Sequence, residues 1–135
     1  GIRGHLNDGM FYDWSKVNEH CPWHLSKKDY QDTKSQDSQI FELPIATFNF
    51  FGLTLRADPV NLNLLNAAFD YHYRNAARDK KPFVFVIISH SPEATYADGK
   101  KTKVVDAMED FIKYAKKFDD VKFVNLRDAY KYKSS

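Results

Sequence analysis

Residues 82–91 read Pro-Phe-Val-Phe-Val-Ile-Ile-Ser-His-Ser, and residues 83–88 are the longest uninterrupted apolar run in the chain. The run consists of β-branched and aromatic residues, which is typical of a strand buried on both faces. It predicts the central strand of a parallel sheet. The run ends abruptly at the polar turn Ser89-His90-Ser91, which we expect at the carboxyl end of that strand, with His90 facing a cleft.

Two helices are predicted by the spacing of apolar residues. Such residues recur at intervals of three and four over residues 59–78 and again over residues 102–118, as on one face of an amphipathic helix. Asp58 and Pro59 suit the N-cap and the first turn of the earlier helix. Residues 127–132 are typical of a closing helical turn.

Shorter apolar stretches flank these helices as predicted strands. Residues 39–48 are rich in strand-forming types, with an edge or a bulge expected at Pro44, which cannot donate to a ladder. Residues 121–124 form a second such stretch. The order β-α-β-α-β over residues 39–135 predicts an α/β fold of parallel strands with right-handed crossover helices. Residues 1–38 are loop-rich, and the length of the chain suits one domain.

Composition limits the classes of function. The 135 residues include 20 basic and 18 acidic ones, and the net charge of +2 is too small to favour nucleic acid or an anionic membrane as a partner. The longest apolar run falls far short of the roughly 20 residues that cross a bilayer, so no membrane partner is expected. Cys21 is the single cysteine, which excludes an internal disulfide and a cysteine-based zinc site. No signal pattern opens the chain, and the compartment stays open.

Histidines supply the candidate reactive groups. His90 follows the predicted central strand, at the end where α/β folds bind ligands, and imidazole transfers protons near neutral pH. The alternative is that His90 caps the following loop. His20 and His24 have the spacing of a metal-chelating pair, but Pro22 lies between them and no carboxylate stands where a third ligand is expected. We therefore predict that the isolated chain binds no catalytic metal, and that His72 is a packing or surface residue.

Five stretches carry a family resemblance, in this order along the chain: Cys21-Pro22-Trp23-His24-Leu25-Ser26, Phe41-Glu42-Leu43-Pro44-Ile45, residues 83–90, residues 111–114 and residues 121–126. Together they resemble the carboxyl-terminal part of polysaccharide deacetylases of the NodB-like superfamily. The resemblance covers nearly the whole chain. It implies a partial distorted (β/α) barrel of the NodB type, with parallel strands and crossover helices.

The resemblance also implies a metal-dependent hydrolase that removes acyl groups from amino sugars. In that chemistry a metal-activated water attacks the amide, a carboxylate takes its proton, and an acid protonates the departing amine. By resemblance His90 is the acid, and Arg3 is the arginine that orients the base. Trp23 and His24 are the expected substrate-binding residues, and a divalent, zinc-like metal belongs to the full-length family enzyme.

The family's Asp-Asp and His-x-x-x-His motifs do not occur ahead of Arg3, so the chain is expected to be one part of such an enzyme and inactive alone. Two alternatives stay open: a non-catalytic deacetylase-like module that binds glycan through aromatic residues such as Trp23 and Tyr30, and a plain α/β unit for structure or interaction. Besides a carbohydrate substrate, the expected partners are a second copy or the missing amino-terminal half, unless residues 2–38 cover the open sheet.

Overall fold

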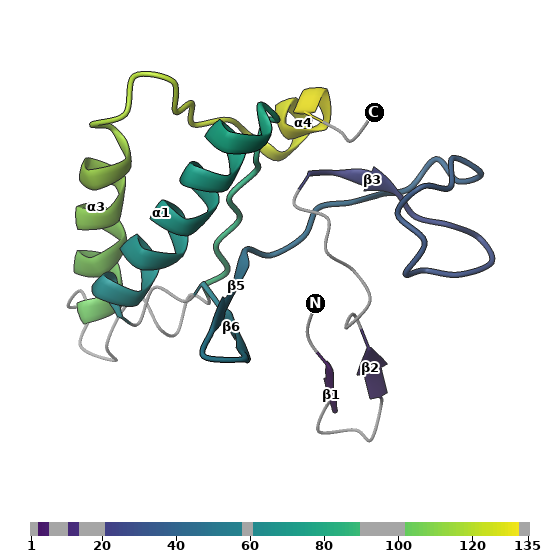
Figure 1. The fold of residues 1–135 in the computed structure, drawn as a ribbon, viewed down its shortest axis with the longest axis horizontal. Coiled ribbons are helices and arrows are strands. Elements are labelled where there is room, and N and C mark those ends of the chain that lie inside the picture. The colour runs from purple at the N-terminus through teal and green to yellow at the C-terminus, as the bar shows by residue number, and fades with distance from the viewer. Residues whose placement is uncertain (1–2, 6–10, 14–20, 58–60, 90–101, 133–135) are drawn as a thin grey trace.

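Two long helices and three pairs of short antiparallel strands are the main elements of the described part of the chain (Figure 1). The computed structural model describes residues 3–5, 11–13, 21–57, 61–89 and 102–132. The helices α1 (Leu62–Asp79) and α3 (Lys103–Ala115) lie side by side. A short helix α4 (Leu126–Ala129) and the 3-10 turn η1 (Tyr130–Tyr132) follow them.

The predicted helices are confirmed. α1 lies where residues 59–78 were expected to be helical, α3 lies within residues 102–118, and α4 with η1 replaces the closing turn. Asp58 and Pro59 lie outside the described residues. The N-cap of α1 is Asn61, whose side-chain oxygen accepts a hydrogen bond of 3.2 Å from the backbone N–H of Leu64.

The predicted fold class is wrong. Every strand pair in the described residues is antiparallel, in three separate two-stranded sheets: β1 (Arg3–His5) with β2 (Phe11–Asp13), β3 (Trp23–His24) with β4 (Phe41–Glu42), and β5 (Thr47–Phe50) with β6 (Leu53–Arg56). No parallel strand and no barrel of the NodB type is present there. Residues 83–88 and 121–124, both predicted strands, are irregular.

A tight turn explains why a local hairpin forms where a parallel sheet was expected. Phe51 and Gly52 have φ angles of 46° and 81°, and Phe50 pairs directly with Leu53 across them. Positive φ at both central residues is the mark of a two-residue hairpin turn, which glycine favours. The chain thus folds back on itself after β5, so β6 occupies the edge that a parallel neighbour would need. Residues 83–88 accept a backbone hydrogen bond from the segment before β5, from the N–H of Ala46 to the carbonyl of Val86 at 3.0 Å.

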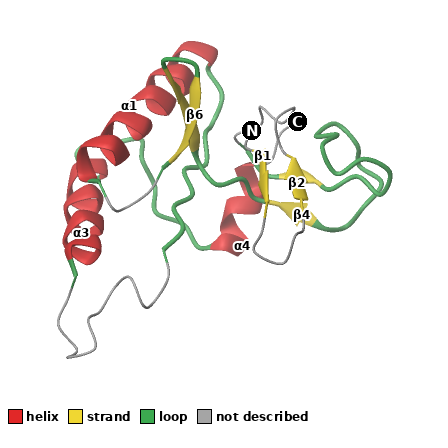
Figure 2. Ribbon diagram, turned by 90° about the horizontal axis from the view of Figure 1, so that it is seen from below, coloured by secondary structure: helices red, strands yellow, loops and turns green. Residues whose placement is uncertain are grey.

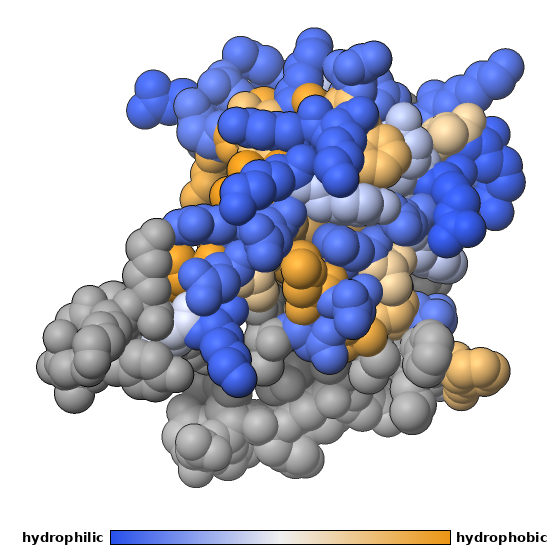
Figure 3. All heavy atoms as spheres, turned by 90° about the vertical axis from the view of Figure 1, so that its left-hand side faces the viewer, coloured by the Kyte–Doolittle hydropathy of each residue, from blue (hydrophilic) through white to orange (hydrophobic). Residues whose placement is uncertain are grey.

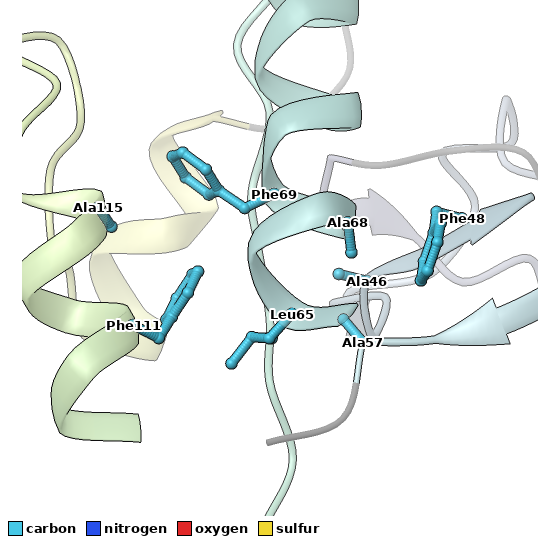
Figure 4. Close-up of a cluster of buried hydrophobic side chains, with 8 residues drawn as sticks. All are labelled: Ala46, Phe48, Ala57, Leu65, Ala68, Phe69, Phe111 and Ala115. Carbon is cyan, nitrogen blue, oxygen red and sulfur yellow. The ribbon is translucent and has the colours of Figure 1, made fainter. Parts of the chain in front are cut away.

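The core lies between the two helices and the base of the β5–β6 hairpin (Figure 4). α1 contributes the buried residues Leu65, Ala68 and Phe69, and α3 contributes Phe111 and Ala115. From the hairpin come Ala46, Phe48 and Ala57, of which Ala57 donates its N–H to the Ala46 carbonyl at 2.8 Å.

The β3–β4 hairpin packs at the far end of the molecule, next to α4 and η1 (Figure 2). The ring of Phe41 on β4 meets Tyr130 of η1 edge to face, with 4.4 Å between the ring centroids. Pro44 falls in the break between β4 and β5, where a sheet needs no donor. This arrangement brings the carboxyl end of the chain against the segment around Trp23.

Candidate functional site

Of the two predicted catalytic residues, Arg3 lies in the described strand β1. His90 lies outside the described residues, so its position stays a prediction, although the strand predicted before it is absent. For Arg3 the structure describes the backbone, which pairs with Asp13 in the β1–β2 hairpin. The structure therefore does not bring these two residues together in a described site.

The predicted substrate-binding residues Trp23 and His24 are held within the β3–β4 hairpin. The side chain of Trp23 is buried, with an exposed fraction of 2%, so its ring offers no face to a sugar. His24 is half-buried, and its Nδ1 donates a hydrogen bond of 2.5 Å to the carbonyl of Ser38. Its ring also packs on Phe41, with 3.9 Å between centroids. Trp23 thus supports the hairpin, and Nδ1 and the ring face of His24 are engaged within it.

Glu42, named in the sequence only as part of a family-like stretch, pairs with Trp23 in the register of this hairpin. Burial raises the pKa of Glu42 above its ordinary value of 4.5. A raised pKa means that the folded state binds the proton more tightly than the unfolded state does. The contribution of protonated Glu42 to the stability of the folded state is therefore fully present below pH 4.5. It is lost as the pH rises through the folded-state pKa.

Replacing Glu42 by glutamine tests this charge effect. We expect Glu42→Gln to raise the midpoint of thermal unfolding at about pH 7 and to change it little at about pH 4, because the amide mimics the protonated acid. Thermal unfolding followed by circular dichroism across this range gives the result. Glu109→Gln, at an exposed site on α3, is the control and should show no such pH dependence. Equal effects of Glu42→Gln at both pH values would contradict the assignment.

An open groove lies between α1, α3 and the two irregular segments. It has a volume of about 580 Å³, and its lining includes residues 82–87, residues 120–126, Phe69 and Phe111. The side of the molecule formed by the helices is in contrast mainly hydrophilic (Figure 3). No described residue among residues 1–38 lines the groove. The open parallel sheet that residues 2–38 were expected to cover does not occur among the described residues, so the expected cover stays a prediction.

The lining of the groove is apolar, with positive charges among its exposed residues. Phe123 is 54% exposed and Leu126 is 76% exposed. Lys80, Lys81 and Lys122 also line the groove. The sequence interpretation missed this surface because it assigned both irregular segments to strands, residues 83–88 to a buried one and residues 121–124 to a short one. A signal was available, since Lys122 falls inside one predicted strand and Lys80 and Lys81 precede the other.

In the described ranges no three His, Cys, Asp or Glu side chains come together in a way that could hold a metal ion. His24 has one ring nitrogen engaged with Ser38, and His20 lies outside these ranges. Within the same ranges, no helix is long and apolar enough to cross a membrane.

Comparisons with known proteins return nothing for this chain. No protein-family model, no curated protein and no solved structure matches it.

Proposed function

We propose that this chain is part of a hydrolase that removes acyl groups from amino sugars, and that it needs a further polypeptide to act. The observation that carries the proposal is the course of residues 82–87, which line the groove and lead through Ser89 to His90 in the sequence. In the sequence, this wall segment is followed after three positions by a histidine, a residue type suited to acid catalysis. The order of the deacetylase-like stretches along the chain is the second support.

The part assigned to His90 is that of general acid. As the bond between the acyl carbon and the nitrogen breaks, protonated imidazole gives its proton to the nitrogen, and the amine leaves neutral. Arg3 would orient a carboxylate base that this chain does not supply. His24 is a candidate for contact with the sugar, and Trp23 acts on the sugar only through the hairpin that it supports. The described residues do not assemble a set of metal ligands.

A second candidate is a non-catalytic interaction unit. The apolar groove favours it, because an open apolar surface of this kind commonly marks a site for another macromolecule. Glycan binding through the face of Trp23 is not favoured, since that side chain is buried. Tyr30, 42% exposed, keeps an accessible ring.

The acid role is tested in the longest in-frame polypeptide that contains this chain, supplied with zinc and an N-acetylated chitooligosaccharide. We expect acetate release, and we expect His90→Ala to reduce its rate by about 10²–10⁴-fold. A general acid must be protonated, so the rate should fall on the alkaline side of the pH profile, and this fall should vanish in His90→Ala.

The exposed residue Lys34, which does not line the groove, provides the control, and Lys34→Ala should keep both the rate and the profile. Two results would reject the acid role: full activity in His90→Ala, or an unchanged alkaline limb. Absence of acetate release from the longer protein would favour the non-catalytic interaction unit over the hydrolase.

A further inference from the structure

We propose that the groove binds an extended segment of a partner polypeptide that is apolar along its length and acidic at one end. This binding is separate from the proposed hydrolysis, because it depends on the walls of the groove and not on His90. Three features of the groove support an occupant of this kind.

The first feature is the backbone of the walls. Residues 83–87 and 121–124 are mostly valine, isoleucine and phenylalanine, which pack well in sheets, yet neither segment belongs to any ladder of the described strands. The carbonyl of Val86 accepts a hydrogen bond of 3.0 Å from the backbone N–H of Ala46, the residue before β5, so the backbone of this wall can bond to a neighbouring segment. An added strand obtains affinity from such main-chain bonds, in the manner of β-strand addition.

The second feature is the apolar surface on the opposite wall. Phe123, Val124 and Leu126 all line the groove and have exposed fractions of 54%, 43% and 76%. Three such residues within four positions are not the scattered apolar residues of an ordinary surface. Apolar side chains of an added strand would remove this area from water, which is the main source of affinity in such a contact.

The third feature is charge. Lys80, Lys81 and Lys122 line the groove and are exposed, whereas Asp120 is the one acidic residue among its described lining. A carboxylate oxygen of Asp120 accepts a hydrogen bond of 2.9 Å from the hydroxyl of Tyr73. The excess of positive charge complements carboxylates, which directs an acidic end of the partner segment to these lysines.

The test uses a phage-displayed library of random peptides of about ten residues, long enough for a strand of ordinary length. Selection on the immobilised chain should enrich peptides with alternating β-branched or aromatic residues and glutamate or aspartate at one end. A synthetic peptide of the consensus should bind about tenfold more weakly to Leu126→Glu and to the double variant Lys80→Glu, Lys122→Glu. N-methylation of alternate residues of the peptide should weaken binding by about the same factor, since it removes main-chain donors.

Two matched controls separate the groove from the rest of the surface. Ile40, 63% exposed, and Lys34 are outside the groove lining, so Ile40→Glu and Lys34→Glu should leave the affinity unchanged. Enrichment without acidic residues, or binding that resists both groove variants, would overturn the proposal. Concentration-dependent dimerisation in sedimentation, abolished by Leu126→Glu, would also overturn it by assigning the groove to a second copy. None of these outcomes depends on acetate release.

Discussion

Replacing Phe69 by alanine is expected to lower the free energy of unfolding by about 3–5 kcal/mol, the range for a large aromatic residue removed from a core. Phe69 has an exposed fraction of 6% and lies at the centre of the helix interface. Its ring centroid lies 5.2 Å from that of Phe118 and 5.7 Å from those of Phe85 and Phe111. Alanine would remove contacts with α3, with the turn after it and with the groove wall at once.

Urea unfolding followed by circular dichroism measures this loss. The matched control is Phe123→Ala, which removes the same atoms from a side chain that is 54% exposed and should cost about 1 kcal/mol or less. A similar loss for the two variants would show that Phe69 is not the centre of the core.

His72 supports the second large expected effect, because it joins α1 to two other parts of the fold. Its exposed fraction is 1%, and its Nε2 donates a hydrogen bond to the carbonyl of Thr47 in β5. Its ring stacks on Phe83 at 4.2 Å between centroids, with only 8° between the planes. Of the two predicted roles of His72, packing or surface, the structure shows packing, together with a polar contact to β5.

Three variants separate the two contributions of His72. His72→Leu keeps most of the volume but leaves the Thr47 carbonyl without this donor, and should cost about 1–3 kcal/mol. His72→Ala also loses the ring contact with Phe83 and should cost more. His72→Gln retains a side-chain N–H and should cost less than His72→Leu in the same urea experiment. If glutamine and leucine are equally destabilising, the hydrogen bond contributes nothing measurable and packing alone accounts for the site.

The helices were predictable because their signal is local. Leu65 and Phe69 are four positions apart, so their place on one face of α1 follows from residues that are close in the sequence. The predicted face is the one buried in the core. Cap positions are less certain from sequence, since Asn61 and Asp58 are both suitable residue types three positions apart.

The strands were not predictable because a strand is defined by its partner. Residues 83–88 have the composition of a buried strand, but composition does not say which backbone lies beside them. The turn at Phe51 and Gly52 decides that question by pairing β5 with β6. The same limit applies to the candidate site. Trp23 was read as an accessible aromatic residue, and only its pairing with Glu42, nineteen positions along the chain, shows the hairpin in which it is buried.

Cys21 gives the molecule an internal reporter of partial opening. Its thiol, with an exposed fraction of 7%, donates to the carbonyl of Pro82 at 3.0 Å, where the first wall of the groove begins. A thiol in that position reacts with a disulfide reagent only from conformations in which this contact has separated. Since the sequence has no other cysteine to compete for the reagent, the labelling rate reports the opening of the contact between the segment around Cys21 and Pro82. Compared with the rate of global unfolding, it shows whether that segment is released while α1 and α3 remain together.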